Sequence, residues 1–140
     1  MCLMFHQGAV FTRRGALDVA NPILLDKVAI SYPNMRIIVA HVGQPWYAET
    51  IVLMWKHPKV YADISARTAR RSQLYNILRM AIDYRVTHKF LWGSDFPVFA
   101  PGASMAHLKA LSDFGPAGFE VPADVVREIL SRQLSDLGLH

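Results

Sequence analysis

The sequence predicts an α/β fold in which parallel strands alternate with helices, and three observations support this prediction. Short apolar segments alternate with longer segments whose apolar residues recur at helical spacing. The apolar segments lack polar alternation, which is typical of parallel strands covered on both faces. Three of these segments end in His6, His41 or Asp95, at the strand ends where α/β proteins keep their chemistry.

The first two units each consist of a predicted strand and a predicted helix. Pro22 suits a first helical turn, and Pro33 ends the same helix because proline lacks an N–H group. We expect strands over residues 2–6 and 36–41, and helices over residues 21–31 and 47–56. The order of strand, loop and helix indicates a repeating β/α unit.

The second half of the chain repeats this order. Leu74, Ile77, Leu78 and Ala81 form an apolar stripe at helical spacing. We expect strands over 59–64 and 88–93, a loop at Pro101-Gly102, and helices over 70–84, 104–112 and 122–134. Four β/α units make half of an eight-unit barrel, so we expect a partial barrel.

Length and composition restrict the class of protein. The 140 residues fit one domain, which we expect to span residues 1–140. Hydrophobic residues reach 52% and charged residues 19%, which argues against disorder. The net charge is +4, but the basic residues are scattered without interleaved aromatic residues, so we expect no nucleic-acid partner.

The same survey bears on compartment and redox state. No apolar run approaches the ~20 residues of a membrane span, and no signal peptide is evident. We therefore expect a cytoplasmic protein without a membrane partner. The single cysteine, Cys2, cannot form an intrachain disulfide, and its apolar neighbours predict a buried thiol.

His6, His41 and Asp95 are the strongest candidates for chemistry. Taken singly, each also has a structural explanation: a strand-end histidine can bond to backbone, and an aspartate can cap a turn. Together they fit a divalent metal such as zinc, because imidazole ligates it and a carboxylate ligates it or accepts a proton from metal-bound water. Three strands would then supply a three-ligand site with one open position.

Two further residues follow strand tips. Trp46 either lines a substrate pocket or packs into the core, and Arg67 either meets a substrate carboxylate or lies in a solvated loop. The remaining histidines singled out by position are expected to be structural, namely His57, His88 and His107.

Specific motifs carry a resemblance to a known family. They include Ala40-His41-Val42-Gly43 and Gly93-Ser94-Asp95-Phe96-Pro97, with longer matching stretches at 25–29, 33–43 and 57–65. On these motifs the chain resembles the amidohydrolase-related family of metal-dependent hydrolases, which also contains decarboxylases of aromatic and unsaturated acids. The resemblance implies a (β/α)8 TIM-barrel fold of which this chain is the C-terminal half, strands 5 to 8.

The resemblance also implies roles for the candidate residues. His6 falls on the fifth-strand metal ligand, and His41 on the sixth-strand histidine that binds a second metal or polarises substrate and water. Asp95 falls on the eighth-strand aspartate, which ligates metal or its water and accepts the proton. The family's first-strand His-x-His has no counterpart in the 140 residues, so zinc binding is expected to be weak or absent if the site is incomplete.

Three functions stay open. The first is metal-dependent hydrolysis of a small organic substrate, carboxylate-bearing or cyclic, by a metal-activated water. The second is non-oxidative decarboxylation of an aromatic or unsaturated acid. The third is a catalytically inactive remnant that acts in interactions, because four strands without partners leave two open edges. A second copy or a partner chain would then complete the barrel.

Overall fold

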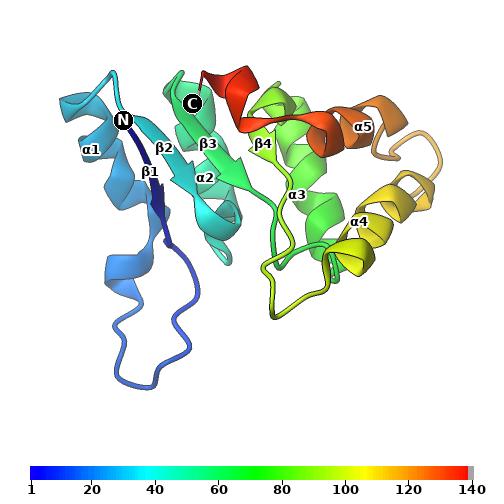
Figure 1. Cartoon of the computed structure of the whole chain (residues 1–140), viewed down its shortest axis with the longest axis horizontal. Coiled ribbons are helices and arrows are strands. Elements are labelled where there is room, and N and C mark those ends of the chain that lie inside the picture. Colours follow the sequence, from blue (N-terminus) through cyan, green and yellow to red (C-terminus); the bar gives the residue numbers. More distant parts are fainter. Residues whose placement is uncertain (139–140) are drawn as a thin grey trace.

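The computed structural model describes residues 1–138 and shows a parallel sheet backed by helices (Figure 1). Its four strands lie in chain order: β1 (Cys2–Phe5), β2 (Arg36–Val39), β3 (Val60–Asp63) and β4 (Phe90–Leu91). Each strand pairs in parallel with the next, so that Leu3, Ile37 and Val60 stand in register. The predicted α/β fold is confirmed, whereas numbering these strands 5 to 8 stays a prediction.

Five α-helices accompany the strands in the described part of the chain. They are α1 (Leu25–Ser31), α2 (Tyr47–Lys56), α3 (Arg71–Asp83), α4 (Pro101–Lys109) and α5 (Ala123–Ser131). In Figure 1, α1, α2 and α3 lie behind the sheet, whereas α4 and α5 lie beyond β4. None of the helices within residues 1–138 is long and apolar enough to cross a membrane.

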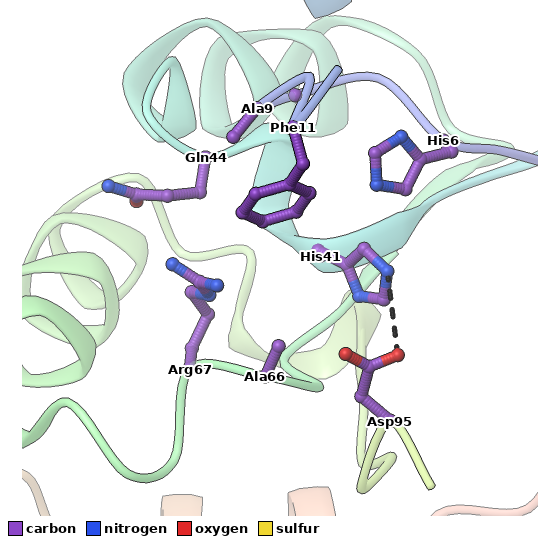
Figure 2. A pocket seen from close by; sticks show the side chains of 9 residues that line it. His6, Ala9, Phe11, His41, Gln44, Ala66, Arg67 and Asp95 are labelled. Carbon is purple, nitrogen blue, oxygen red and sulfur yellow. Dashed lines mark ion pairs between the residues drawn. The ribbon is translucent and has the colours of Figure 1, made fainter. Parts of the chain in front are cut away.

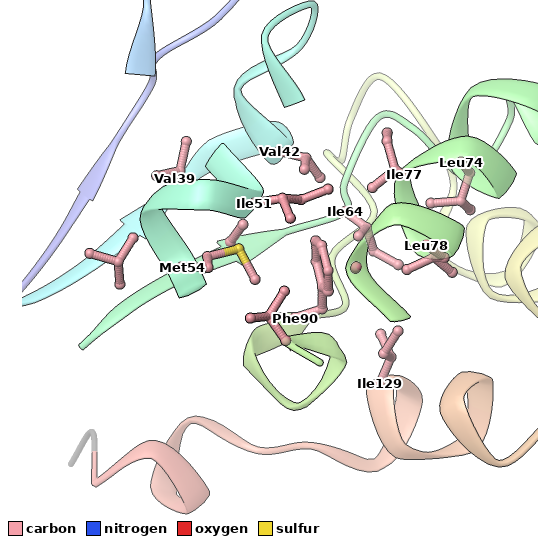
Figure 3. Packing of buried hydrophobic residues seen from close by; sticks show 14 of the residues in the cluster. Val39, Val42, Ile51, Met54, Ile64, Leu74, Ile77, Leu78, Phe90 and Ile129 are labelled. Carbon is pink, nitrogen blue, oxygen red and sulfur yellow. The ribbon is translucent and has the colours of Figure 1, made fainter. Parts of the chain in front are cut away.

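The main core lies between the sheet and its helices (Figure 3). Apolar side chains on the helix-facing side of the strands are fully or almost fully buried, namely Ile37, Val39, Val60, Ala62 and Phe90. The stripe predicted on α3 meets them, because Leu74, Ile77, Leu78 and Ala81 are all 0% exposed. Burying one large apolar side chain contributes roughly 1.5–3 kcal/mol, so this layer fixes the positions of the strand tips.

The opposite face of the sheet is covered unevenly. Ile38 and Leu91 are 4% and 6% exposed, but Met4 on β1 is 61% exposed. The segment after α5 crosses the N-terminal ends of the strands, where Arg132 donates to the carbonyl oxygens of Thr87 and Phe90. β1 is an edge strand, and the predicted pairing of this edge with another chain stays a prediction.

The position of β1 corrects one expectation. Cys2 is exposed rather than buried, because its strand lies at the sheet edge and one side of it meets no neighbouring strand. An apolar sequence around a cysteine therefore does not bury it when the covering layer is missing. Partial desolvation of the sulfur still raises the pKa of its thiol, against the opposing charge of Arg36.

Several element boundaries also differ from expectation. The prediction of a loop at Pro101-Gly102 is wrong, because α4 begins at Pro101 and proline fits a first helical turn. The helix expected over 122–134 ends at Ser131, since Arg132 is extended. The expected 21–31 helix begins as a 3₁₀ turn at Pro22–Leu24. The first three strands are slightly shorter than expected, and the fourth contains two residues.

Candidate functional site

A cavity of about 290 Å³ opens at the carboxyl ends of the strands (Figure 2). His6, His41, Arg67 and Asp95 all line it, so the structure brings together four of the five residues singled out from the sequence. The other lining residues are Gly8, Ala9, Phe11, Gln44 and Ala66. The loops after β1, β2, β3 and β4 thus meet at one edge of the sheet, as expected for parallel strands.

The backbone after β2 turns sharply to present His41. This residue has φ 107° and ψ 37°, and Val42 follows with φ 38°. Gly43 has φ 62°, and a Cβ there would lie 2.5 Å from Oγ1 of Thr50, so the close approach requires glycine. Left-handed backbone at a non-glycine residue costs of order 1–3 kcal/mol, and the packed surroundings of the turn hold it in place.

Two strands supply the partners of the His41 imidazole. Its Nδ1 lies 2.5 Å from Oγ of Ser65, and the Ser65 hydroxyl donates to Oδ1 of Asp63. The backbone N–H of Ser65 donates to the same oxygen at 2.8 Å. On the other side of the ring, Nε2 lies 3.9 Å from Oδ1 of Asp95 (Figure 2). The imidazole therefore stands between a buried carboxylate and one that lines the cavity.

These charges shift the ionisation of the site. Asp63 raises the pKa of His41 most strongly, Asp95 adds to this, and burial and Arg67 oppose it. Burial lowers the pKa of Arg67, and the positive charge of Arg70 adds to this effect. The site thus holds a histidine whose cationic form is favoured beside an arginine whose charge is partly desolvated.

His6 approaches His41 edge-on, with ring centroids 5.2 Å apart at an interplanar angle of 74°. Imidazole and carboxylate donors suit a divalent transition metal. However, within residues 1–138 no three or more His, Cys, Asp or Glu side chains converge closely enough to hold a metal ion. His6, His41 and Asp95 share a cavity without forming a complete ligand set.

Arg67 and Gln44 give the cavity an unsatisfied polar wall. Nε of Arg67 and Oε1 of Gln44 are buried and find no hydrogen-bond partner among residues 1–138. In Figure 2 both side chains lie on the side of the cavity away from Asp95, with the Phe11 ring between them and the histidines. Buried polar atoms normally have partners, so this wall is suited to a polar ligand group.

Trp46 is placed differently. It stands at the N-cap position of α2 and is half-buried, but it is not among the residues that line the 290 Å³ cavity. Its role in binding substrate therefore stays a prediction that the cavity does not support.

Sequence reasoning missed Asp63, Ser65, Gln44 and Phe11. Asp63 and Ser65 are two residues apart at a strand end, so the period of a strand places them on one side of the sheet. That spacing, next to a strand ending in His41, was the available signal. Gln44 and Phe11 lie in loops without a regular period and carried no such signal.

Parallel strands, covering helices and a His–Asp pair at the strand tips define an α/β fold with a candidate site at the carboxyl ends of its strands. The chain belongs to the amidohydrolase family, whose profile matches residues 2–132, and this confirms the resemblance in the sequence motifs. Proteins of this family generally use divalent metals.

A solved structure supports the fold. The chain is similar to an uncharacterized TIM-barrel protein from Bordetella bronchiseptica, with a TM-score of 0.71 and 16% sequence identity. The match covers 99% of this chain and 47% of that protein, so the chain spans about half the length of its structural neighbour. A comparison with curated proteins finds no match.

Proposed function

We propose that this chain forms part of a hydrolase site for small organic substrates that carry a carboxylate or a ring. The observation that carries the proposal is the placement of His41 Nε2 and Asp95 Oδ1, 3.9 Å apart, in the cavity that Arg67 also lines. A general acid or base must lie within reach of the reacting proton, and both groups have access to the same space.

Asp95 and His41 take complementary roles in this proposal. Asp95 accepts the proton of the attacking water, and His41 Nε2 polarises the substrate or exchanges a proton with the leaving group. Their separation of 3.9 Å exceeds a direct hydrogen bond, which leaves both atoms free for a third group. Positioned acid–base groups of this kind contribute roughly 10²–10⁴-fold in rate.

A divalent ion, with zinc favoured by the imidazole donors, is proposed to meet His6, His41 and Asp95. The donor types fit zinc, but their arrangement within residues 1–138 does not complete a ligand set. We therefore expect this chain alone to bind zinc weakly. Equilibrium dialysis with elemental analysis tests this, and tight stoichiometric zinc would contradict it.

Arg67, Gln44 and Phe11 are proposed to hold the unreactive end of the substrate. The guanidinium would pair with a carboxylate, the Gln44 oxygen would accept a donor, and the Phe11 ring would cover an apolar or cyclic part. The cavity of about 290 Å³ lies at the lower limit of sites for drug-sized ligands. This size favours small acids over extended chains.

Hydrolysis of a panel of small lactones, amides and esters tests the proposal, each compound being paired with an analogue that lacks the carboxylate. We expect the acids to be hydrolysed with the higher kcat/KM. Arg67→Met should remove this preference, whereas Arg70→Met, at an exposed neighbouring position, should retain it.

The same assay separates the alternatives. Release of CO₂ from an aromatic or unsaturated acid would show that the reaction is decarboxylation rather than hydrolysis. Absence of turnover on every compound, with zinc supplied, would contradict catalysis and favour a structural role.

A further inference from the structure

We propose that Asp63 and Ser65 are positioning residues that hold neutral His41 with its hydrogen on Nδ1. The exposed atom Nε2 then carries the lone pair that meets a proton, a metal ion or a substrate. The inference rests on the proposed function of His41 but concerns a property that can be measured without substrate.

The positions of the hydrogen atoms follow from the donors available. Ser65 has one hydroxyl hydrogen, and its Oγ contacts both Asp63 Oδ1 and His41 Nδ1. An ionised carboxylate only accepts hydrogen bonds, so the hydroxyl hydrogen must point at Asp63. The remaining lone pairs of Oγ face Nδ1, which satisfies them only when it carries a hydrogen.

Asp63 is itself fixed, which gives the chain of hydrogen bonds its direction. It is 6% exposed and Ser65 is 5% exposed, so water does not compete freely for either side chain. The backbone N–H of Ser65 donates to Oδ1 of Asp63 at 2.8 Å, and this bond holds the oxygen that accepts the hydroxyl. A hydrogen bond on one imidazole nitrogen sets the state of the other.

The neighbouring strand leaves room for this arrangement. Gly93, which follows β4, lies against Ser65, and a Cβ at Gly93 would stand 3.2 Å from Cβ of Ser65. A larger residue would therefore press on Ser65. Nε2 therefore points toward Asp95 and the cavity, while Nδ1 points into the protein.

Nitrogen-15 NMR of histidine-labelled protein tests the proposal directly. Spectra are recorded without metal at about pH 9, above the ordinary imidazole pKa of about 6.5, and the signals of His41 among the 6 histidines are assigned by their loss in His41→Asn. We expect Nδ1 to show the shift of a protonated nitrogen and Nε2 that of an unprotonated one. The reverse pattern in the wild-type protein would overturn the proposal without any need for a further variant.

Variants then identify the cause. Ser65→Ala should move the population toward hydrogen on Nε2, and Ser65→Thr, which keeps the hydroxyl, should restore the wild-type pattern. Ser104→Ala is the matched control, because Ser104 is a buried serine that bonds Thr68 rather than His41. An unchanged His41 pattern in Ser65→Ala would overturn the proposed role of Ser65.

This measurement is independent of turnover. If the protein hydrolyses nothing but shows the expected pattern, the proposed function fails and the positioning of His41 stands. If the protein is active with hydrogen on Nε2 of His41, the function stands and the positioning role fails.

Discussion

The two ends of the sheet each hold a His–Asp pair, and the pairs are built differently. At the N-terminal end, His57 Nε2 lies 2.7 Å from Oδ1 of Asp26, and Lys56 binds the same carboxylate. At the carboxyl end, His41 reaches Asp63 through Ser65 and keeps Nε2 free. The direct His57–Asp26 contact, to which Lys56 adds a charge, stabilises the fold. The contact of His41 with Asp63 through Ser65 instead leaves Nε2 of His41 available for chemistry.

The backbone at the two histidines shows the same difference. His57 has an extended conformation, with φ −111° and ψ 120°, and simply leads from α2 into β3. His41, Val42 and Asp95 all have positive φ, in a region that costs free energy for such residues. At the carboxyl end, strained backbone therefore presents the side chains that line the cavity. Four predictions test this contrast between the two ends.

The largest expected effect is on turnover. Asp95→Asn should lower kcat on a hydrolysed substrate by about 10²–10⁴-fold, because the proton acceptor is removed. Asp26→Asn should leave kcat unchanged and lower the free energy of unfolding by about 1 kcal/mol. Steady-state kinetics and urea unfolding measure the two effects, and loss of kcat in Asp26→Asn would break the contrast.

The next effect concerns Lys89, at the N-terminal end, whose Nζ donates to the carbonyl oxygens of Met54 and His57. Burial lowers its pKa from 10.5 to about 8. At pH values between these two, Lys89 is neutral in the folded protein but protonated in the unfolded chain. The free energy of unfolding should therefore rise with pH in this range.

Relative to Lys89→Met, the wild-type protein should gain about 2–3 kcal/mol across this pH window. Urea unfolding of both proteins at several pH values measures the gain. A constant difference between the two would contradict the desolvation of Lys89.

The third effect compares the two histidines. His57→Ala should lower the free energy of unfolding by about 1–2 kcal/mol, because its hydrogen bond to Asp26 is lost. His41→Gly also loses a hydrogen bond, to Ser65, but glycine relieves the left-handed conformation and offsets this loss by about 1 kcal/mol. We therefore expect a smaller loss for His41→Gly than for His57→Ala in urea unfolding, and equal losses would show that the turn at His41 is not strained.

The smallest expected effect is electrostatic. Asp63→Asn removes the charge that most raises the pKa of His41, so that pKa should fall toward or below its ordinary value. Arg70→Met serves as a control at a distance from the imidazole. NMR titration of His41 measures the change, and an unchanged pKa would show that Asp63 does not govern its ionisation.

Part of the site could be read from the sequence because its residues stand at strand tips. His41 and Asp95 each end an apolar segment beside a glycine or a turn, and parallel strands bring such tips to one edge. Asp63 escaped notice because it belongs to the predicted strand itself, and its partner Ser65 is a common residue in any loop. Their significance depends on contacts across neighbouring strands.

The elements were predictable for a related reason. The stripe of α3 is regular, so its position follows from periodicity. Pro101 was misread as a loop residue, since proline marks a helix start as well as a turn. The exposure of Cys2 depends on which strand lies at the edge, and an apolar run alone does not reveal sheet order.

Arg36 joins both ends of the described chain. Its backbone N–H donates to the carbonyl oxygen of Met1 at 3.2 Å, and its Nε donates to that of Leu137 at 2.9 Å. Both ends thus lie near the N-terminal end of the sheet (Figure 1), whereas the cavity opens at its carboxyl end. A surface tether or a fused domain at either end would leave the mouth of the cavity unobstructed. A short linker between the ends would suit a circular permutation whose new termini lie in the exposed 115–118 loop.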